Sequence, residues 1–311
     1  MADTPNVLII IPTYNRAHYL AEAIDSALQQ DYPHKKIAIV DDGSTDSTRQ
    51  LCETYVNRHP NIVSYQYQKN AGCSTARNRG LAMIDEDTAY VCFLDSDDRL
   101  LPGKLSREVM LLDTHPDCGF TYSDAIVHDE VSVIEERQTV AGAKNPDSFA
   151  LEHFLTNAAK PSAILYRAAV VGNLRFREDL LYNEDSEFLQ RVAFDSTGIY
   201  SDVPGCWMRW HANSKSRNLV DILKAVLRSN TDLLSCYPEF HQANKATINN
   251  MMEKSRRLLA TRLLLAKRWQ EVAEYSDRPF LLMQAKLRFS GLQQAREQIN
   301  MWLNKRHLKH H

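Results

Sequence analysis

The sequence lacks several signatures that identify common classes of protein. No apolar run among its 311 residues reaches the roughly 18 residues that a membrane-spanning helix needs. The six cysteines form no CxxC pair, so neither a zinc site nor a disulfide framework is indicated, and we expect free thiols. No GxGxxG follows the first apolar run, and the chain has no P-loop motif (GxxxxGK followed by Ser or Thr). An ordinary dinucleotide-binding fold and a P-loop fold are therefore both disfavoured.

Charge is unevenly distributed along the chain. The N-terminus has an acidic residue before its short apolar run and lacks the basic start of a secretory signal. We therefore expect a cytoplasmic protein, with peripheral contact at the inner face of the membrane as an alternative. Residues 251–311 carry 13 Lys and Arg against 5 Asp and Glu, a balance of +8, whereas residues 1–250 carry 24 against 34, a balance of −10. Such a basic tail indicates either a solvated helical face or an anionic partner.

Polar clusters follow three short apolar runs that are typical of buried strands. Val7–Ile11 leads into Pro12–Arg16, Ile37–Val40 into Asp41–Asp46, and Tyr90–Leu94 into Asp95–Asp98. Helical patterns lie between the runs, and this alternation with short connections predicts an α/β fold with an open, mostly parallel sheet. Because ligands bind beyond the carboxyl ends of such strands, we expect the three clusters to share one site.

The third cluster contains three carboxylates in four positions. Asp95, Asp97 and Asp98 repel one another, so they stay ionised together only if a cation or several donors compensate them. Oxygen ligands suit Mg²⁺ or Mn²⁺, which keep positions open for phosphate oxygens. Asp95-Ser96-Asp97 is therefore a candidate metal-diphosphate site. The alternative is an acidic turn that caps a helix beginning near Pro102.

The ordered series PTYNR, VDDGSTD, NAGCSTARNRG, FLDSDD, NED and WMRWHANSKS resembles the family-two glycosyltransferases of the GT-A fold. The resemblance covers roughly Asn6 to Ser216, and this family is the large inverting group that builds bacterial polysaccharides and glycolipids. It implies a GT-A catalytic domain in residues 1–218, with a nucleotide-sugar part at about 1–124 and an acceptor part at about 125–218. Residues 219–311 are expected to form a basic helical C-terminal region.

The resemblance implies which residues bind the nucleotide. Asp42 would accept the imide N–H of uracil, with Asp41 or Asp46 nearby, and the alternative is a turn built with Gly43. Tyr14 would stack on the base, unless it is a core tyrosine. The other donor-binding residues that the resemblance implies are Pro12, Thr13, Arg16, Arg77, Asp95 and Ser96.

The resemblance also implies a metal site for Mn²⁺ or Mg²⁺. Asp97 would be the direct ligand and Asp95 would lie by the ribose, whereas Asp98 is interpreted as a helix cap. His211 would complete the metal shell or hold the diphosphate, unless it is a histidine on a surface loop. Three further residues of that basic, hydroxyl-bearing loop are candidates to hold the diphosphate: Arg209, Ser214 and Lys215.

The NED motif precedes an apolar-periodic helix with Phe188, Leu189 and Val192. By resemblance, Asp185 is the general base that takes a proton from the acceptor hydroxyl, and Glu184 orients Asp185 or the acceptor. The alternative is an acid-rich first turn of a helix, which is common because acids complement the helix dipole.

These observations predict a metal-dependent inverting glycosyltransferase of bacterial surface polysaccharide synthesis. Its donor is expected to be a nucleotide-diphosphate sugar, UDP-linked rather than GDP-linked, and its acceptor a hydroxyl of a glycan or lipid-linked molecule. The alternative is a non-catalytic nucleotide-sugar-binding module of a polysaccharide assembly complex. No nucleic-acid partner is expected. The C-terminal helices are interpreted as packing on the catalytic domain, with dimerisation or membrane contact as alternatives.

Overall fold

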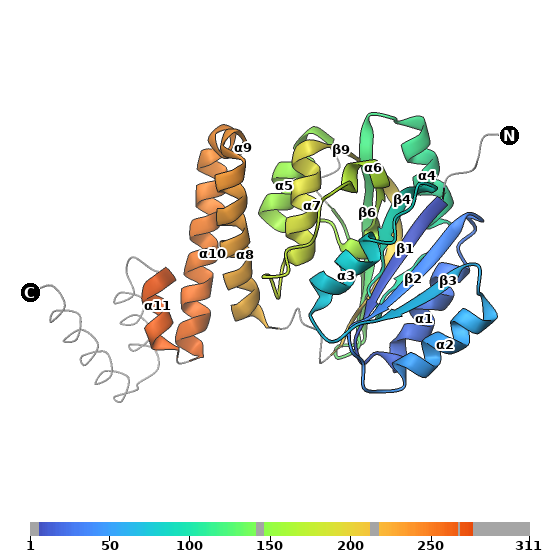
Figure 1. Ribbon diagram of the computed structural model, residues 1–311. Helices are drawn as coiled ribbons and strands as arrows, with labels where there is room; N and C mark the ends of the chain where they lie inside the picture. The colour runs from blue at the N-terminus through green and yellow to red at the C-terminus, as the bar shows by residue number, and fades with distance from the viewer. Residues whose placement is uncertain (1–5, 141–145, 212–217, 267, 276–311) are drawn as a thin grey trace, which may run out of the picture. The chain divides into compact units, whose positions relative to one another are not determined.

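The computed structural model describes residues 6–140, 146–211, 218–266 and 268–275 (Figure 1). Within this part of the chain, nine strands form one sheet: β1 (Asn6–Thr13), β2 (Lys35–Asp41), β3 (Val63–Tyr67), β4 (Thr88–Phe93), β5 (Arg99–Leu100), β6 (Cys118–Asp129), β7 (Ile134–Gln138), β8 (Ile164–Arg167) and β9 (Thr197–Trp210). The helices are α1 (Ala17–Leu28), α2 (Thr48–Arg58), α3 (Cys73–Leu81), α4 (Lys104–Thr114), α5 (Phe149–Thr156), α6 (Ala168–Val171), α7 (Glu184–Asp195), α8 (Leu219–Cys236), α9 (Pro238–Ala243), α10 (Lys245–Leu265) and α11 (Trp269–Tyr275). Two single turns of 3₁₀ helix, η1 (Pro146–Ser148) and η2 (Pro161–Ala163), complete the described elements.

The sheet has a parallel half and a mixed half. Its strand order is β3-β2-β1-β4-β8-β6-β9-β5, with β7 paired to β6. The strands β3, β2, β1 and β4 are parallel to one another, which confirms the expected α/β architecture for the first part of the chain. In the second half β8 is antiparallel to both β4 and β6, so the sheet as a whole is mixed rather than mostly parallel.

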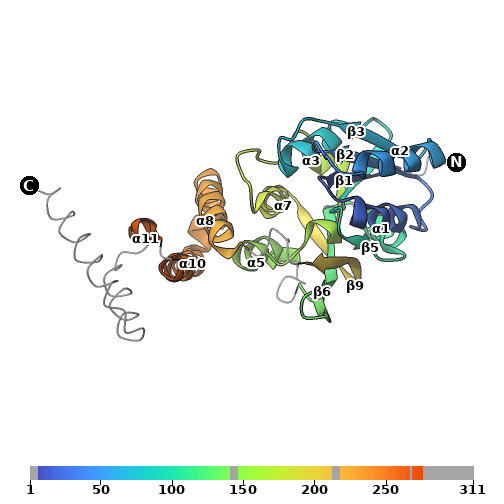
Figure 2. The ribbon, with the colours of Figure 1, turned by 90° about the horizontal axis from the view of Figure 1, so that it is seen from below.

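The apolar residues of β1 alternate between two cores. Val7, Ile9 and Ile11 are fully buried against α1, α2 and α4, whereas Leu8 and Ile10 face the core that includes residues of α3, α5 and α7. Figures 1 and 2 accordingly show α1 and α2 on one face of the parallel strands and α3 on the other. Strands that bury both faces lack a polar alternation, which is why the sequence has continuous apolar runs there.

Helix α3 approaches β1 very closely at Gly80. A Cβ atom at this position would lie 2.3 Å from Cγ2 of Ile10, so any side chain would push the helix off the sheet. This close contact holds the preceding turn of α3, with Arg77 and Asn78, near the carboxyl end of the parallel strands.

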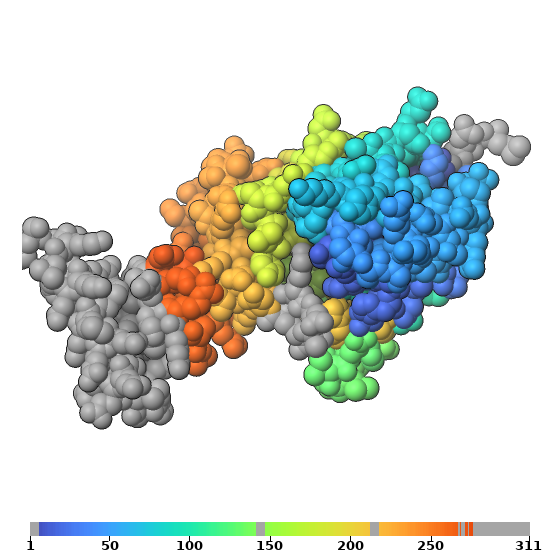
Figure 3. All heavy atoms as spheres, turned by 60° about the horizontal axis from the view of Figure 1, so that its bottom comes forward, coloured from blue at the N-terminus to red at the C-terminus, as the bar shows by residue number. Residues whose placement is uncertain are grey.

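The last strand, β9, runs further than the sequence suggested. Trp207 to Trp210 were expected in a loop, but they pair with β6 from Ile126 to Asp129. The β6–β7 hairpin, green in Figure 3, projects from the surface beside β9. Its tip carries the exposed apolar residues Val131, Val133 and Ile134. Pairing with a long neighbouring strand is a tertiary effect that the local sequence pattern of this segment does not specify.

The C-terminal helices α8 to α11 do not all belong to one compact unit. Contacts divide the described chain into a first unit that includes residues 228–244 and a second unit of residues 219–227 together with those from Lys245 onward. The boundary therefore falls inside α8, whereas a division after residue 218 was expected. Within the second unit, Lys224 of α8 pairs with Glu271 of α11. No helix in the described ranges has both the length and the apolarity to cross a membrane.

Candidate active site

The loops after β1 and β2 are joined by the side chain of Asn15. Its Oδ1 accepts a hydrogen bond from Thr45 N at 2.7 Å, and its own backbone N donates to Ser44 Oγ at 2.8 Å. Asn15 has a left-handed backbone (φ 51°), which Asn adopts more readily than most residues. The sequence analysis did not assign a role to Asn15. Asparagine in a short polar turn directly after a buried strand was the signal that could have indicated it.

Asp41 and Asp42 are both buried, and both hold loops in place. Asp41 accepts from Ser44 N and from Tyr65 OH, each at 2.8 Å. Asp42 accepts from Gln68 Nε2 at 2.7 Å and from the backbone N of Ala71 and Gly72, each at 2.8 Å. A carboxylate has about four lone-pair positions, so Asp42 can still accept from a ligand. Its contact with the base stays a prediction.

The turn between β2 and α2 is held by Asp46 rather than by the residue that precedes the helix. Ser47 precedes α2 but makes no side-chain capping bond. Instead Asp46 Oδ1 accepts from Thr48 N at 3.0 Å, and Asp46 Oδ2 accepts from Ala17 N at 3.3 Å. Burial acts to raise the pKa of Asp46, but the hydrogen bonds from Thr48 and Ala17 outweigh it and the pKa is lowered. Asp46 thus ties the starts of α1 and α2 together.

The end of β1 combines an exposed aromatic ring with buried polar atoms. Pro12 and Thr13 are buried in the strand, whereas Tyr14 is 46% exposed, so the core-tyrosine alternative is wrong. Within the described residues, Thr13 Oγ1 and Ser74 Oγ are buried without a hydrogen-bond partner. Thr13 ends β1 and Ser74 lies in the first turn of α3, and buried polar atoms such as these hydroxyls normally have partners.

The DSDD turn after β4 divides its carboxylates between two roles. Asp95 and Asp97 keep 32% and 22% of their side chains exposed, whereas Asp98 and Ser96 are buried. Asp98 accepts from Ser162 Oγ at 3.0 Å and from Arg209 N at 3.1 Å. Burial, together with the charges of Asp95 and Asp97, raises the pKa of Asp98 well above its usual range.

The interpretation of Asp98 as a helix cap is wrong. Helix α4 begins at Lys104 after Gly103, whose left-handed backbone (φ 73°) forms the turn, and no side-chain cap is present. The short strand β5 lies between Asp98 and the helix. Asp98 instead fastens the DSDD turn to β9 and η2, so this turn is not a solvent-facing cap.

Asp97 and His211 converge at the same edge of the sheet. Oδ2 of Asp97 lies 3.1 Å from His211 Nε2 and 3.5 Å from Arg16 Nε. His211 is only 5% exposed, so the surface-loop alternative for this residue is wrong. The guanidinium of Arg209 pairs with Glu130 at 2.7 Å and Glu22 at 2.8 Å, and its Nε donates to the backbone O of Asp97 at 3.3 Å. The remaining diphosphate candidates of that segment, Ser214 and Lys215, lie outside the described residues.

The donor set around Asp97 fits a metal that binds together with phosphate. Among the described residues, no group of three or more His, Cys, Asp or Glu side chains is arranged to hold a metal ion. The side chains that could hold a metal at this place are Asp97, through a carboxylate oxygen, and His211, through an imidazole nitrogen. Mg²⁺ is commonly held by one or two carboxylates plus substrate phosphates and water, and Mn²⁺ accepts similar oxygen ligands. The donor atoms of Asp97 and His211 fit such a metal, and the metal site stays a prediction.

Arg77 links the DSDD turn to the NED motif. Its Nη2 donates to Asp95 Oδ1 at 2.8 Å and its Nη1 to Glu184 Oε1 at 3.0 Å. Burial alone would lower the pKa of Arg77, but the neighbouring Cys73, Asp95 and Glu184 raise it well above its usual range. Arg77 is 3% exposed, and its Nε has no partner among the described residues. Arg77 thus bridges Asp95 and Glu184. Its direct contact with the donor stays a prediction.

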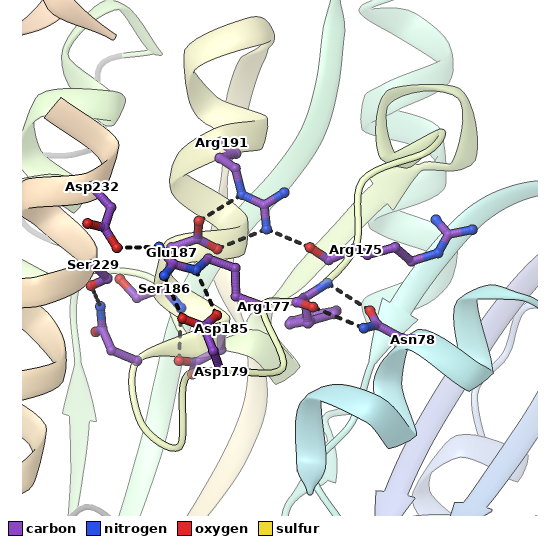
Figure 4. A network of polar contacts seen from close by, with 12 residues as sticks. Asn78, Arg175, Arg177, Asp179, Asp185, Ser186, Glu187, Arg191, Ser229 and Asp232 are labelled. Carbon is purple, nitrogen blue, oxygen red and sulfur yellow. Dashed lines mark hydrogen bonds and ion pairs between the residues drawn. The ribbon is translucent and has the colours of Figure 1, made fainter. Parts of the chain in front are cut away.

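Asp185 lies in the first turn of α7 and is less tied than its neighbours (Figure 4). Its Oδ1 accepts from Ser186 N, at 2.8 Å, within its own turn. Glu184 is held by Arg77, and Glu187 by a double hydrogen bond from Arg191 at 2.9 and 2.8 Å. The acid-rich first turn of α7 thus contains the predicted base. Asp185 is half-buried, whereas Glu184 and Glu187 are buried.

Comparison with known proteins identifies the family. The sequence model described as Glycosyl transferase family 2 matches residues 8–168. An uncharacterized glycosyltransferase of Rickettsia prowazekii is 30% identical over 208 residues, which is 64% of this chain and 62% of the relative. The minor teichoic acid biosynthesis protein GgaA of Bacillus subtilis is 43% identical over 93 residues, 29% of this chain and 21% of GgaA. The matches thus span less than two thirds of these relatives.

Among solved structures, Staphylococcus aureus TarS 1–349 in complex with UDP-GlcNAc aligns with 93% of this chain and 92% of that chain. The TM-score is 0.59 at 18% sequence identity, which confirms the expected GT-A fold. The family match covers half of the chain and includes the motifs after β1, β2 and β4. The chain therefore belongs to glycosyl transferase family 2.

Proposed function

We propose that this glycosyltransferase moves a sugar from a UDP-sugar to a hydroxyl of a glycan or lipid-linked acceptor, with inversion at the anomeric carbon. The observation that carries the proposal is the Arg77 bridge, with 2.8 Å to Asp95 and 3.0 Å to Glu184. One guanidinium joins the predicted donor motif to the predicted base motif. A donor at the DSDD turn and an acceptor at the start of α7 would therefore share one site.

Several observations support a nucleotide-diphosphate donor. The exposed ring of Tyr14 is available to stack on a base. Asp42 retains acceptor capacity for a ring N–H, which uracil offers. TarS, which has a similar fold, is described in complex with UDP-GlcNAc. These points together favour a UDP-linked sugar.

The class of acceptor is inferred from the similarity of the chain to a relative. GgaA carries minor teichoic acid biosynthesis in its name, and its similarity supports a polymer of the bacterial cell surface as the product. The fold by itself does not select an acceptor, because family members with the same sheet differ in the loops around it. We place the acceptor near α7, where the segment before Asn183 carries the exposed residue Leu181.

The reaction is a single displacement. The acceptor oxygen forms a bond to the anomeric carbon as the bond from that carbon to the diphosphate oxygen breaks, and the diphosphate leaves with the electron pair. Asp185 takes the hydroxyl proton, and a carboxylate suffices because the hydroxyl becomes acidic only as the new bond forms. A divalent ion at Asp97 and His211 would neutralise the charge of the leaving diphosphate. Arg77 keeps Glu184, and with it the first turn of α7, beside Asp95.

The test is the Asp185→Asn variant with a panel of UDP-sugars and water as the acceptor. We expect UDP-sugar affinity close to that of the unchanged chain and a turnover rate lower by about 10²- to 10⁴-fold, the usual worth of a general base. Asp195→Asn, at the exposed end of the same helix, is the matched control and should leave turnover unchanged. Asp42→Ala should chiefly weaken nucleotide binding.

A second readout checks the stereochemistry. Once an acceptor is found, proton NMR of the product should give an anomeric configuration opposite to that of the donor. Retention of configuration, or wild-type turnover by Asp185→Asn, would overturn the proposed mechanism and direct attention to Glu187. Both results leave the family assignment intact, because that assignment rests on residues 8–168.

A further inference from the structure

The segment that leads into α7 is fastened at several points. On one side, the Asn78 side chain makes two hydrogen bonds to the backbone of Phe176, accepting from its N at 2.7 Å and donating to its O at 2.9 Å. On the other side, Arg177 pairs with Asp232 of α8 at 2.8 Å. Asp179 pairs with Arg228 of the same helix. The segment from Phe176 to Asp179 is therefore held between α3 and α8.

The last residue before α7 is fastened to α8 as well. Asn183 Nδ2 donates to Ser229 Oγ at 3.0 Å. Ser229 is fully buried, and it lies three residues before Asp232, so both side chains face the same way from the helix. Figure 4 shows Ser229 and Asp232 on α8 beside this segment, with Asp185 and Ser186 at the start of α7. These contacts belong to the first of the two compact units.

Asn183 is the point where the chain turns into the helix. Its backbone is left-handed (φ 64°, ψ 14°), and α7 starts at the next residue. This conformation is uncommon outside glycine, although asparagine adopts it more readily than most residues, so the contacts that restrain it matter. The bond to Ser229 is such a restraint. The direction of the Asp185 side chain, two residues on, depends on where this turn begins.

We propose that Ser229 is a positioning residue for transfer: through Asn183 it sets the first turn of α7 and so aims the Asp185 carboxylate at the acceptor. The inference rests on the proposed function, in which Asp185 is the base. Helix α8, in the C-terminal third of the chain, thereby becomes part of the catalytic arrangement, although it contributes no group to the substrates. Small misplacements of a catalytic group are costly, about 10²-fold for a shift of 1 Å.

The experiment is a double-mutant cycle in the full chain, with Ser229→Ala, Asp185→Asn and both together. Turnover is measured on the UDP-sugar that the unchanged chain hydrolyses fastest from UDP-GlcNAc, UDP-GalNAc, UDP-Glc and UDP-Gal, with water as acceptor. We expect Ser229→Ala to lower kcat about 10-fold with the donor KM unchanged. In the Asp185→Asn background the same change should lower kcat less than about twofold, because residues that act through one another are not additive.

Two further variants keep the test decisive. Ser235→Ala makes the same substitution at an exposed position of α8 and should keep the wild-type kcat. Asn183→Gly removes the amide but retains easy access to the left-handed backbone, so it should reproduce the loss caused by Ser229→Ala. UDP affinity, measured by calorimetry, reports whether each variant is folded.

The outcomes separate the positioning role from the base assignment. Equal losses of kcat from Ser229→Ala in the unchanged chain and in Asp185→Asn would mean a purely structural role and would overturn the inference. A wild-type kcat for Ser229→Ala, with Asp185→Asn slow, would overturn it as well. Neither result changes the assignment of Asp185 as the general base. Loss of UDP binding by both Ser229→Ala and Asn183→Gly would also overturn it, since the contact would then serve folding. Wild-type turnover by Asp185→Asn would remove both the base assignment and the inference.

Discussion

At the scale of single residues, burial separates the acidic side chains that hold loops from those that keep part of their carboxylates exposed. Asp41, Asp42 and Asp98 are buried, and each accepts at least two hydrogen bonds from the protein. Asp95 and Asp97 keep part of their carboxylates exposed. Asp97 is partnered by His211 at 3.1 Å and by Arg16 at 3.5 Å.

This division predicts a metal-dependent contribution to nucleotide binding. We expect UDP to bind more tightly with Mn²⁺ or Mg²⁺ than with a chelator, and Asp97→Asn to remove most of that difference while the fold is retained. The reason is that the amide cannot supply the anionic oxygen that a hard cation prefers. Calorimetry with and without metal measures the effect, and the exposed Asp87→Asn is the matched control. Equal affinity with metal and chelator for the unchanged chain would contradict the prediction.

At the scale of elements, α7 is held from several sides. Arg77 of α3 binds Glu184, and His153 of α5 lies 3.2 Å from Ser186 Oγ through Nε2. Ala159 N donates to Nδ1 of His153, so we assign the proton to Nε2. His153 is buried and stacks on Phe149 at 5.6 Å between ring centroids. Helix α5 thus supports the turn that carries Asp185 with a neutral imidazole.

The buried imidazole predicts a pH dependence of stability. Burial lowers the pKa of His153 to about 3, whereas an exposed histidine has a pKa of about 6.5. Below about pH 6.5 the unfolded chain binds a proton that the folded chain does not, so stability is full above that pH and is lost as the pH falls toward 3. Between pH 6.5 and 5 the loss from this group should be about 2 kcal/mol.

His153→Gln should reduce that loss, because glutamine does not titrate and retains a donor for Ser186. The measurement is urea unfolding at pH 7 and pH 5, compared between the variant and the unchanged chain. His34→Gln, at an exposed position, should keep the original pH dependence. If His153→Gln loses as much stability between the two pH values as the unchanged chain, the imidazole is not held neutral.

At the scale of the whole molecule, the first unit contains every described residue assigned to the donor, the metal and the base. It also contains residues 228–244, which include the α8 segment with Ser229 and Asp232. The second unit contains α10 and α11 and the first half of α8, together with most of the basic excess of the chain. The expectation that the basic tail serves an acceptor or a membrane surface stays a prediction.

A chain that ends at Asn244 tests the independence of the first unit. We expect it to bind UDP with the affinity of the full chain, because all the predicted donor contacts are retained. Binding to vesicles that contain anionic lipid should be weaker than for the full chain, and the difference should shrink as salt is raised, because salt screens exposed charges. A soluble shortened chain that no longer binds UDP would mean that the second unit is needed to complete the first.

The sequence by itself determined the features that depend on local pattern. The apolar runs at Val7–Ile11, Ile37–Val40 and Tyr90–Leu94 became β1, β2 and β4, because a run of that length bounded by polar turns has few other ways to be buried. Parallel strands end at a common edge, so the polar clusters after them had to meet there. The helix after the NED motif followed from its 3.6-residue period.

Only the tertiary structure decided what depends on contacts between distant positions. The pairing of Trp207–Trp210 with β6, the contacts of Asp98 with Ser162 and Arg209, and the bridge from Arg77 to Glu184 join segments between 64 and 111 residues apart. The bond from Asn183 to Ser229, 46 residues away, and the division of α8 between two units are of the same kind. Local pattern cannot specify these contacts, because their free energy arises only when the rest of the fold brings the two partners together.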